Sequence, residues 1–329
     1  MTASVPPVAP REAAVSVPVE SVRIAKSRSG PRRFDRLVRL VSEPGFDLLL
    51  NSHVVIFGVG GVGGFAAEGL ARSGIGKLTL VDFDVVCATN VNRQIQALAN
   101  TVGKLKAELL AERVRAIHPQ CQVTAVPQFY SEATAELLLP ADDPPDFVVD
   151  AIDHVTAKMH LMDRCRRLGI PIVSSMGAAG KLDPTVIEVC DLYESHTDPL
   201  ARALRRNLRR KYGWPEAVGK REKAVVSGVT VVYSRESRRM PIPPSWDREH
   251  GFQCICPHDE NDIDLCHSRN LIEGSAVFVT SVFGMVAASV VVRRIVGDHV
   301  APTRAEVGAS RDGMPGCGTS PTPTDDEDD

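Results

Sequence analysis

The segment "HVVIFGVGGVGGFAAEGLARSGIGKLTLVDFD", residues 53–84, is the part of this 329-residue chain that most constrains its fold. It contains a buried-strand pattern, a glycine cluster, a helical pattern and a second strand pattern that ends in two acids. The glycines form G-x-G-G-x-G between the first strand and the helix, at Gly58, Gly60, Gly61 and Gly63. Glycines there permit a tight turn and let a phosphate approach the backbone, and the helix N-terminus adds oriented N–H groups. The segment therefore predicts a nucleotide-binding unit, but it does not distinguish NAD(P) for hydride transfer from another nucleotide.

Strand and helix patterns continue to alternate after this segment, which predicts a parallel sheet covered on both faces. Strands are expected at 54–58, 77–82, 122–127, 146–153 and 170–175, and helices at 62–73, 104–117, 131–139 and 156–168. The later part differs, with strand patterns at 185–192 and 225–234, a basic helix at 199–212 and an irregular loop at 236–270. We therefore expect an α/β fold with a Rossmann-like doubly wound, mostly parallel sheet and an antiparallel C-terminal extension.

The composition of the two ends indicates one folded domain, 34–297, between two tails. Residues 1–33 are rich in Pro, Ser, Val and Arg, and residues 298–329 end in five acids; both are expected to be disordered. The apolar run 276–296 is interpreted as a buried helix that closes the core, with a membrane anchor as the alternative.

The charge and the cysteines bear on partners and on compartment. The net charge of −3 includes the acidic tail, so the folded part is close to neutral and no DNA partner is expected. The eight cysteines are scattered, and reduced thiols predict a reducing, cytoplasmic location. A mitochondrial presequence is the alternative interpretation of the N-terminal tail.

Polar residues after the second strand indicate which nucleotide chemistry is served. Asp82 follows Gly63 by 19 residues, a spacing that suits a carboxylate on ribose hydroxyls, and Asp84 lies two residues later. The loop beyond them supplies further candidates for nucleotide binding, namely Asn90, Asn92, Arg93 and Gln94, and Lys106 follows at a helix start. Hydride transfer does not need cations directed at phosphates, whereas an enzyme that splits a triphosphate does, because negative charge builds up on the phosphate oxygens.

Two carboxylates at the end of the fourth expected strand are candidate metal ligands. Asp150 and Asp153 would lie at the carboxyl edge of the sheet, near the phosphates, where acidic side chains suit Mg²⁺. The alternative for each is capping of the next helix.

These motifs together resemble the ubiquitin-activating superfamily, the ThiF, MoeB and HesA proteins. The resemblance rests on G-x-G-G-x-G, D-x-D, T-N-x-N-R-Q, a lysine thirteen residues after the arginine, and D-x-x-D. It implies ATP and Mg²⁺ as cofactors and adenylation of a carboxylate. It further implies that Gly61 and its neighbours hold the phosphates, that Asp82 binds the ribose, and that Asp153 holds Mg²⁺. Asn90, Arg93 and Lys106 would contact the triphosphate, with Arg93, Lys106 and Asp153 as the catalytic set.

Longer stretches are similar to the tRNA threonylcarbamoyladenosine dehydratases within this superfamily. They are "ARSGIGKLTLVDFD", "NRQIQAL", "VGKLKAELLAERVRAIHP", "VVDAIDHVTAK" and "DPLARALRRNLRRKYG", and the similarity extends over about 33–296. It implies an ATP-dependent ligase-type enzyme that adenylates the threonine carboxylate of threonylcarbamoyladenosine, beside the tRNA anticodon, and cyclises it with release of AMP and pyrophosphate.

The alternative function is an adenylyltransferase that activates the C-terminus of a ubiquitin-like or sulfur-carrier protein. Proteins of that kind have two C-x-x-C pairs for zinc, and this chain has none. The loop with Cys254, Cys256 and Cys266 has a different spacing, so metal binding and an ordinary reduced loop both remain open there.

The expected helix 199–212 carries a run of basic residues with no acid between Pro199 and Pro215, which suits tRNA phosphates. The candidates for tRNA binding are Arg202, Arg205, Arg206, Arg209, Arg210 and Lys211. The alternative is a solvated basic helix. The resemblance also implies a homodimer with an arginine contributed in trans, Arg36 or Arg39, and a cysteine desulfurase or sulfur acceptor is a further candidate partner.

Overall fold

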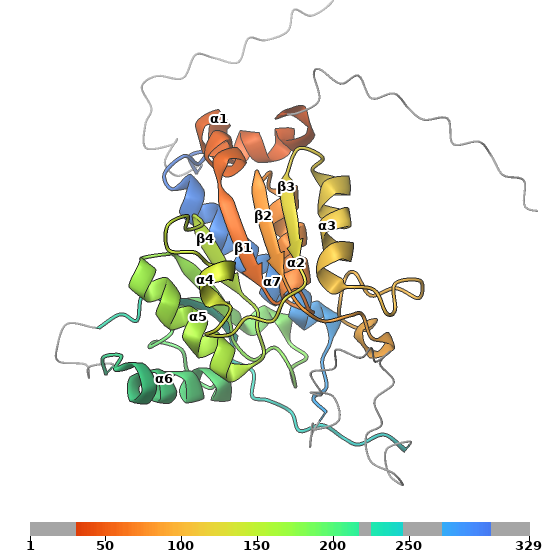
Figure 1. Ribbon diagram of the computed structural model, residues 1–329, viewed down its shortest axis with the longest axis vertical. Helices are drawn as coiled ribbons and strands as arrows, with labels where there is room; N and C mark the ends of the chain where they lie inside the picture. Colours follow the sequence, from red (N-terminus) through yellow and green to blue (C-terminus); the bar gives the residue numbers. More distant parts are fainter. Residues whose placement is uncertain (1–30, 217–224, 246–271, 304–329) are drawn as a thin grey trace, which may run out of the picture.

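The sheet predicted from the sequence is present in the computed structural model, which describes residues 31–216, 225–245 and 272–303 (Figure 1). Its strands lie in the order β3-β2-β1-β4-β5-β7-β6. Their bounds are β1 His53–Phe57, β2 Lys77–Val81, β3 Gln122–Val126, β4 Phe147–Asp150, β5 Ile172–Ser175, β6 Ile187–Asp191 and β7 Thr230–Ser234. The neighbours pair in parallel, except that β6 and β7 are antiparallel. The predicted fold class is therefore confirmed.

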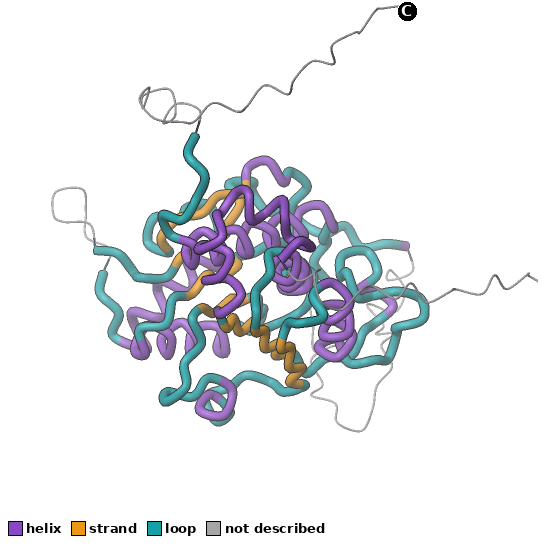
Figure 2. The backbone as a smooth tube through the Cα atoms, turned by 90° about the horizontal axis from the view of Figure 1, so that it is seen from above, coloured by secondary structure: helices purple, strands orange, loops and turns teal. Residues whose placement is uncertain are grey.

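Helices cover both faces of this sheet (Figure 2). The helices that pack on one face are α1 Asp35–Asn51, α2 Gly63–Arg72, α3 Lys106–Ile117 and α7 Val277–Val296. Those on the other face are α4 Ala135–Leu138, α5 Val155–Leu168 and α6 Pro199–Tyr212. The described residues also contain short 3-10 turns: η1 Pro31–Phe34 directly precedes α1, and η2 Ala88–Asn90 and η3 Pro184–Val186 lie in connections.

The continuous hydrophobic runs of the central strands follow from burial on both faces. In β1, Val54 and Ile56 belong to the core under α2 and α7, whereas Val55 and Phe57 belong to the core under α5. The strand therefore contributes alternate side chains to two cores and needs no polar face.

The apolar helix predicted near the C-terminus is α7, which closes the first of these cores. By length and composition α7 could cross a membrane, but half of its most apolar window is buried within the protein. Val279, Phe283 and Val291 are fully buried against the core. At Gly284 the helix approaches α2 so closely that an added Cβ would lie 2.3 Å from the carbonyl oxygen of Val62.

Several element boundaries differ from the expected ones. Helix α1 was not predicted, because Pro44 and a kink at Ser42, with φ of +61°, interrupt its helical pattern. Helix α4 begins at Ala135, not at Ser131, whose N–H instead donates to the hydroxyl of Thr134. Strand β7 begins only at Thr230, because Asp191 binds the preceding N–H groups of Ser227 and Gly228 in a turn.

The described structure extends beyond the expected folded domain, 34–297, at both ends. The chain does not leave the fold at residue 298, because the Ala301 N–H donates to the Leu40 carbonyl of α1 at 2.8 Å. At the other end, η1 begins at Pro31, within the segment expected to be a tail. Residues 1–30 and 304–329, and most of the expected loop 236–270 including Cys254, Cys256 and Cys266, lie outside the described residues.

The close approach of α7 to α2 predicts that Gly284→Ala destabilises the protein. Ala is the better helix former, but its methyl group would overlap the backbone of α2, and overpacking typically reduces the unfolding free energy by about 1–3 kcal/mol. Urea denaturation measures this loss. Ser289→Ala, on the exposed side of the same helix, is the matched control, and equal stability of the two variants would contradict the prediction.

Candidate nucleotide-binding site

The four glycines of the loop after β1 have two different roles. Gly58 has a φ of +80°, and a Cβ on Gly63 would lie 1.8 Å from the carbonyl oxygen of Gly58, so these two form the tight turn. The other two face the loop 90–96: a Cβ on Gly60 would lie 3.6 Å from Nε2 of Gln94, and one on Gly61 would lie 3.3 Å from the Arg93 carbonyl. The loop therefore presents bare backbone toward this polar segment.

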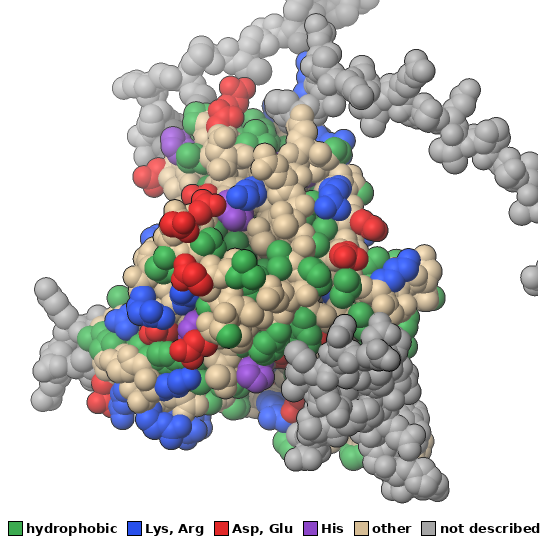
Figure 3. Space-filling view, in the orientation of Figure 1, with side chains coloured by type: hydrophobic (Ala, Val, Ile, Leu, Met, Phe, Trp, Pro, Cys, Tyr) green, Lys and Arg blue, Asp and Glu red, His purple; other side chains and the backbone are tan. Residues whose placement is uncertain are grey.

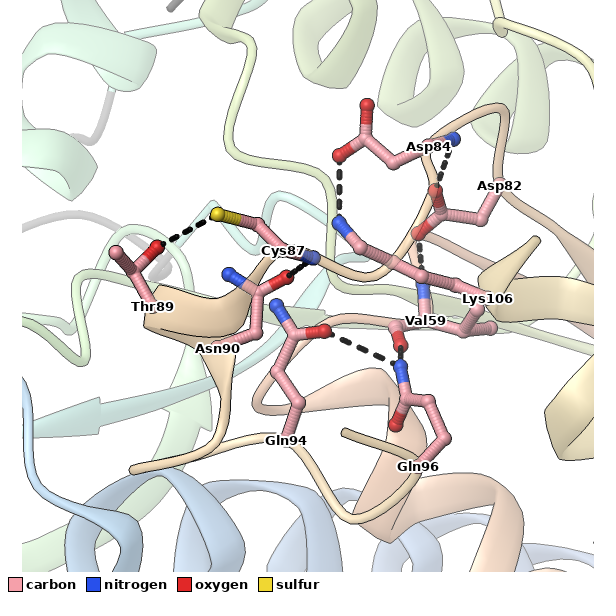
Figure 4. Close-up of polar contacts among 9 residues, drawn as sticks. All are labelled: Val59, Asp82, Asp84, Cys87, Thr89, Asn90, Gln94, Gln96 and Lys106. Carbon is pink, nitrogen blue, oxygen red and sulfur yellow. Dashed lines mark hydrogen bonds and ion pairs between the residues drawn. The ribbon is translucent and has the colours of Figure 1, made fainter. Parts of the chain in front are cut away.

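Asp82 fastens the glycine loop to the end of β2 (Figure 4). One carboxylate oxygen accepts the Val59 N–H at 2.7 Å, and the other accepts the Asp84 N–H at 2.9 Å. Burial raises the pKa of Asp82, and the positive charge of Lys106 opposes that rise only in part. Asp82 thus shapes the loop, and Asp84, whose side chain is 47% exposed, is the more accessible of the two acids.

Lys106 is a buried cation whose charge is balanced by these acids. Its Nζ lies 2.6 Å from a carboxylate oxygen of Asp84, and its side chain is 8% exposed. Burial alone would lower the pKa of Lys106, but Asp82, Asp84 and Asp153 outweigh that effect and leave the pKa raised. The ammonium group is therefore held charged beside the glycine loop, although it stands at the first residue of α3, where the helix dipole opposes a cation.

The polar loop after β2 is braced by its own amides. Asn90 is buried and accepts the Cys87 N–H, and Cys87 itself is buried beside the Thr89 hydroxyl. Gln96 donates through Nε2 both to the Val59 carbonyl, at 2.7 Å, and to the side chain of Gln94. Gln96 was not among the predicted site residues, and its signal was the alternating polar pattern of "NRQIQ".

Arg93 and Asn92 lie on the more exposed side of this loop. Arg93 donates to the Thr89 carbonyl at 2.9 Å and to the Asn92 side chain at 3.0 Å. Asn92 in turn donates to the Ser275 carbonyl just before α7, so the loop is connected to the core helix. The structure thus brings Asn90, Asn92, Arg93 and Gln94 to one side of the glycine loop.

The two carboxylates after β4 are placed differently from each other. Asp150 is fully buried, 2.9 Å from Nζ of Lys158, which is also fully buried, and it accepts the Ser174 hydroxyl. This position corrects the expectation that Asp150 is a candidate metal ligand beside the nucleotide phosphates, because its carboxylate is committed to a structural ion pair. Asp153 is exposed, and its charge acts on Lys106. His154, and neither acid, caps α5.

Helix α6 has the predicted bounds, and its arginines divide into two groups. Asp198 caps the helix by accepting the Ala201 N–H, and Gly213 ends it with φ of +66°. Arg205 is turned inward, where it donates to the carbonyls of Leu192 and Ser195, so it anchors the helix and does not belong to an exposed tRNA-binding face.

The remaining basic residues of α6 are exposed, and Lys and Arg side chains gather over this helix in Figure 3. They are Arg202, Arg206, Arg209, Arg210 and Lys211. Of these, Arg209 forms an ion pair with Glu216, and Lys211 lies over the ring of Tyr212.

A glycine loop, a balanced lysine and exposed acids at the carboxyl edge of a doubly wound sheet define an α/β protein with a nucleotide-phosphate site. The sequence matches the ThiF family over residues 34–312. It is 40% identical over 268 residues to the tRNA threonylcarbamoyladenosine dehydratase of Bacillus subtilis. The matched region covers 81% of this chain and 95% of that protein. The chain therefore belongs to the ThiF family, and it groups there with the tRNA threonylcarbamoyladenosine dehydratases, as the sequence predicted.

Two further comparisons differ in how much of the chain they cover. The Escherichia coli tRNA N6-threonylcarbamoyladenosine dehydratase, solved in complex with ATP, superposes with a TM-score of 0.68 at 36% identity, over 87% of this chain and 99% of that one. The E. coli molybdopterin-synthase adenylyltransferase is 34% identical over only 139 residues, which is 42% of this chain.

The Asp150–Lys158 pair gives a test of the structural role assigned to it. Asp150→Leu leaves the Lys158 ammonium buried without its counter-ion, and such a loss typically reduces the unfolding free energy by about 3–5 kcal/mol. The double variant Asp150→Leu with Lys158→Met should recover much of that stability, because no buried charge remains. Urea unfolding of the two variants decides, and a double variant less stable than the single one would disprove the assignment.

Proposed function

We propose that this protein uses ATP to dehydrate threonylcarbamoyladenosine in tRNA to its cyclic form. The observation that carries the proposal is the charged lysine at the glycine loop, held between Asp82 and Asp84. This arrangement suits nucleotide phosphates, and the E. coli relative solved with ATP supports ATP as the nucleotide. The relatives that the chain matches over most of its length support the tRNA substrate.

The reaction converts a poor electrophile into a reactive one. The threonine carboxylate oxygen attacks the α-phosphorus of ATP, the bond from that phosphorus to the bridging oxygen breaks, and pyrophosphate leaves. A nitrogen or oxygen of the same side chain then attacks the acyl carbon, loses its proton to solvent and expels AMP. The protein orients the groups and neutralises phosphate charge, so Lys106 and Arg93 suffice without a cysteine nucleophile.

The residues present also fit a magnesium ion. Mg²⁺ is commonly held by one or two carboxylates together with substrate phosphates, and Asp153 is an exposed carboxylate close enough to influence Lys106. Asp153 would hold the ion, and Asp84 is the second accessible acid. A bound Mg²⁺ would neutralise charge on the phosphates.

Exposed arginines of α6 are proposed to bind the tRNA backbone. Arg202 and Arg206 lie one helical turn apart and are both exposed, which suits contact with successive phosphates. Arg210 continues that line.

The position of α1 favours an arginine supplied in trans by a second copy of the chain. This helix leads into the amino end of β1, whereas the glycine loop follows the carboxyl end of the same strand (Figure 1). Arg36 and Arg39 are thus remote from the site of their own chain, and both are exposed. Arg39 is engaged in an ion pair with Asp35 at 2.9 Å, so we favour Arg36.

The second candidate function is activation of a ubiquitin-like or sulfur-carrier protein, with a cysteine desulfurase or sulfur acceptor as partner. The partial match to the molybdopterin-synthase adenylyltransferase favours it, but over far less of the chain. We therefore retain the tRNA dehydratase as the function, in the cytoplasm.

Lys106→Ala is predicted to bind tRNA as the wild type does but to lose at least about 100-fold in turnover, because a transition-state charge contact is removed. The assay mixes protein, ATP, Mg²⁺ and tRNA carrying the linear modification, then measures AMP and a base lighter by one water. Lys104→Ala, an exposed lysine two residues away, is the control and should remain active. Full activity of Lys106→Ala would refute the phosphate assignment.

The double variant Arg202→Ala/Arg206→Ala is predicted to bind tRNA more weakly. It should also have a salt slope reduced by about 2, since each phosphate contact contributes about one unit. Filter binding over a range of salt concentrations measures both effects. Arg293→Ala/Arg294→Ala, an exposed pair at the end of α7, is the matched control. The same affinity and slope in both double variants would exclude α6 as the tRNA-binding surface.

A further inference from the structure

A cavity of about 180 Å³ lies past the carboxyl end of β5, between the β5–β6 connection and the start of α6. Sites for drug-sized ligands are typically about 300–1,000 Å³, so this one suits a group the size of an amino acid better than a whole nucleotide. Its charged lining residues are Lys181, Arg238, Asp198 and Glu273, and Ala179 and Pro199 are apolar neighbours.

The walls of the cavity are part of the folded framework. The Gly180 N–H donates to the Gly274 carbonyl, and the Arg239 N–H donates to the Gly180 carbonyl, each at 2.8 Å. Gly180 has a φ of +71°, and a Cβ there would lie 2.8 Å from Cγ of Arg238. Three segments that are distant in sequence are therefore closely joined around the cavity.

The acids of the cavity are already bound, whereas its cations have capacity left. Asp198 accepts the N–H groups of Ala201 and Gly177. Lys181 is 4% exposed, and among contacts with the described residues one of its three donors is used, toward the Glu236 carbonyl at 2.8 Å. Burial lowers the pKa of Lys181, and Asp198 and Glu236 offset this only in part, so an added anion would favour its charged form.

Arg238 stands at the mouth of the cavity, paired with Glu273. Both side chains are about one-third exposed, at 36% and 33%. An ion pair at that exposure is worth little in free energy, so Arg238 can exchange the carboxylate of Glu273 for that of a ligand at small expense.

The cavity lies at the same edge of the sheet as the nucleotide site and adjoins the start of α6. Strand β5 is the direct neighbour of β4, and the connection after β4 carries Asp153. The opposite wall includes Pro199, the first residue of α6, whose exposed arginines are the candidates for tRNA binding. A nucleotide held along α6 would therefore have this cavity beside it, at the same edge of the sheet as the glycine loop.

We propose that this cavity binds the threonyl end of the modified adenosine, with its carboxylate held by Lys181 and Arg238. This proposal rests on the proposed function and deepens it, because it assigns the residues that distinguish the modified nucleotide from plain adenosine. The small volume fits the threonyl group, and the cations fit its charge.

The test compares the dissociation constants of the full-length protein for two tRNAs. One carries threonylcarbamoyladenosine, and the other carries unmodified adenosine at the same position. The wild type should prefer the modified tRNA by about tenfold or more, as expected for a charge-assisted hydrogen bond in a partly buried site. Lys181→Met and Arg238→Gln should each reduce that preference about tenfold and leave the affinity for unmodified tRNA unchanged.

Arg239→Gln is the matched control, since Arg239 neighbours Arg238 in sequence, pairs with Glu236 and does not line the cavity. It should keep the wild-type preference. If Lys181→Met does not fold, Arg238→Gln at the mouth decides alone.

The outcomes separate the two proposals. A wild type that releases AMP with the modified tRNA, while both variants keep the full preference, overturns the cavity assignment and leaves the function standing. A wild type that neither releases AMP nor prefers the modified tRNA overturns the proposed function, and the assignment with it.

Discussion

The hydrogen bond from the Val59 N–H to the carboxylate of Asp82 is the interaction on which the rest of the site depends. It joins the glycine loop after β1 to the end of β2, and the same carboxylate also orders the next turn through the Asp84 N–H. Because Asp82 is buried and negatively charged, it helps to keep a buried cation, Lys106, in the charged form. The loop shape and the site charge therefore have one common origin.

Two buried lysines differ in the exposure of the acid that each one pairs with, and this exposure decides whether a ligand can reach the pair. Lys158 and Asp150 are both fully buried, so neither can exchange its partner for a ligand without breaking the core. Lys106 is nearly as buried, but its partner Asp84 is about half exposed and faces the same edge as the glycine loop. The two ion pairs therefore differ in access to solvent: of the two, the pair of Lys106 and Asp84 has an exposed member.

The sequence was sufficient to predict the fold class and the strand–loop–helix unit, because the periodicity of hydrophobic residues and the spacing of glycines are local properties of the chain. It was sufficient for α6 as well, whose cap residues Asp198 and Gly213 are explicit in the sequence. It could not show that Asp150 and Arg205 are turned inward whereas Asp153 and Arg206 are exposed. A difference of one to three residues along the chain is enough to change which way a side chain faces. The sequence also missed Gln96, because the alternating polar pattern around this residue does not show that its side chain binds the Val59 carbonyl of a loop distant in sequence.

The strand order explains why nucleotide site, cavity and basic helix lie next to one another. The chain reverses direction across the sheet at β1 and β4, so the connections after β1, β2 and β4 converge on one crevice. Strand β5 continues outward from β4, and its connection forms the cavity wall at the same edge. Strand β6 runs antiparallel to β7, and the segment that follows β6 leads to the start of α6 at the cavity, where Asp198 accepts the Gly177 N–H. Asp198 both caps α6 and binds the connection after β5, so it joins the start of the basic helix to the cavity wall. If α6 binds the tRNA backbone and Lys181 binds the threonyl carboxylate, as proposed, this connection would fix the position of one binding surface relative to the other.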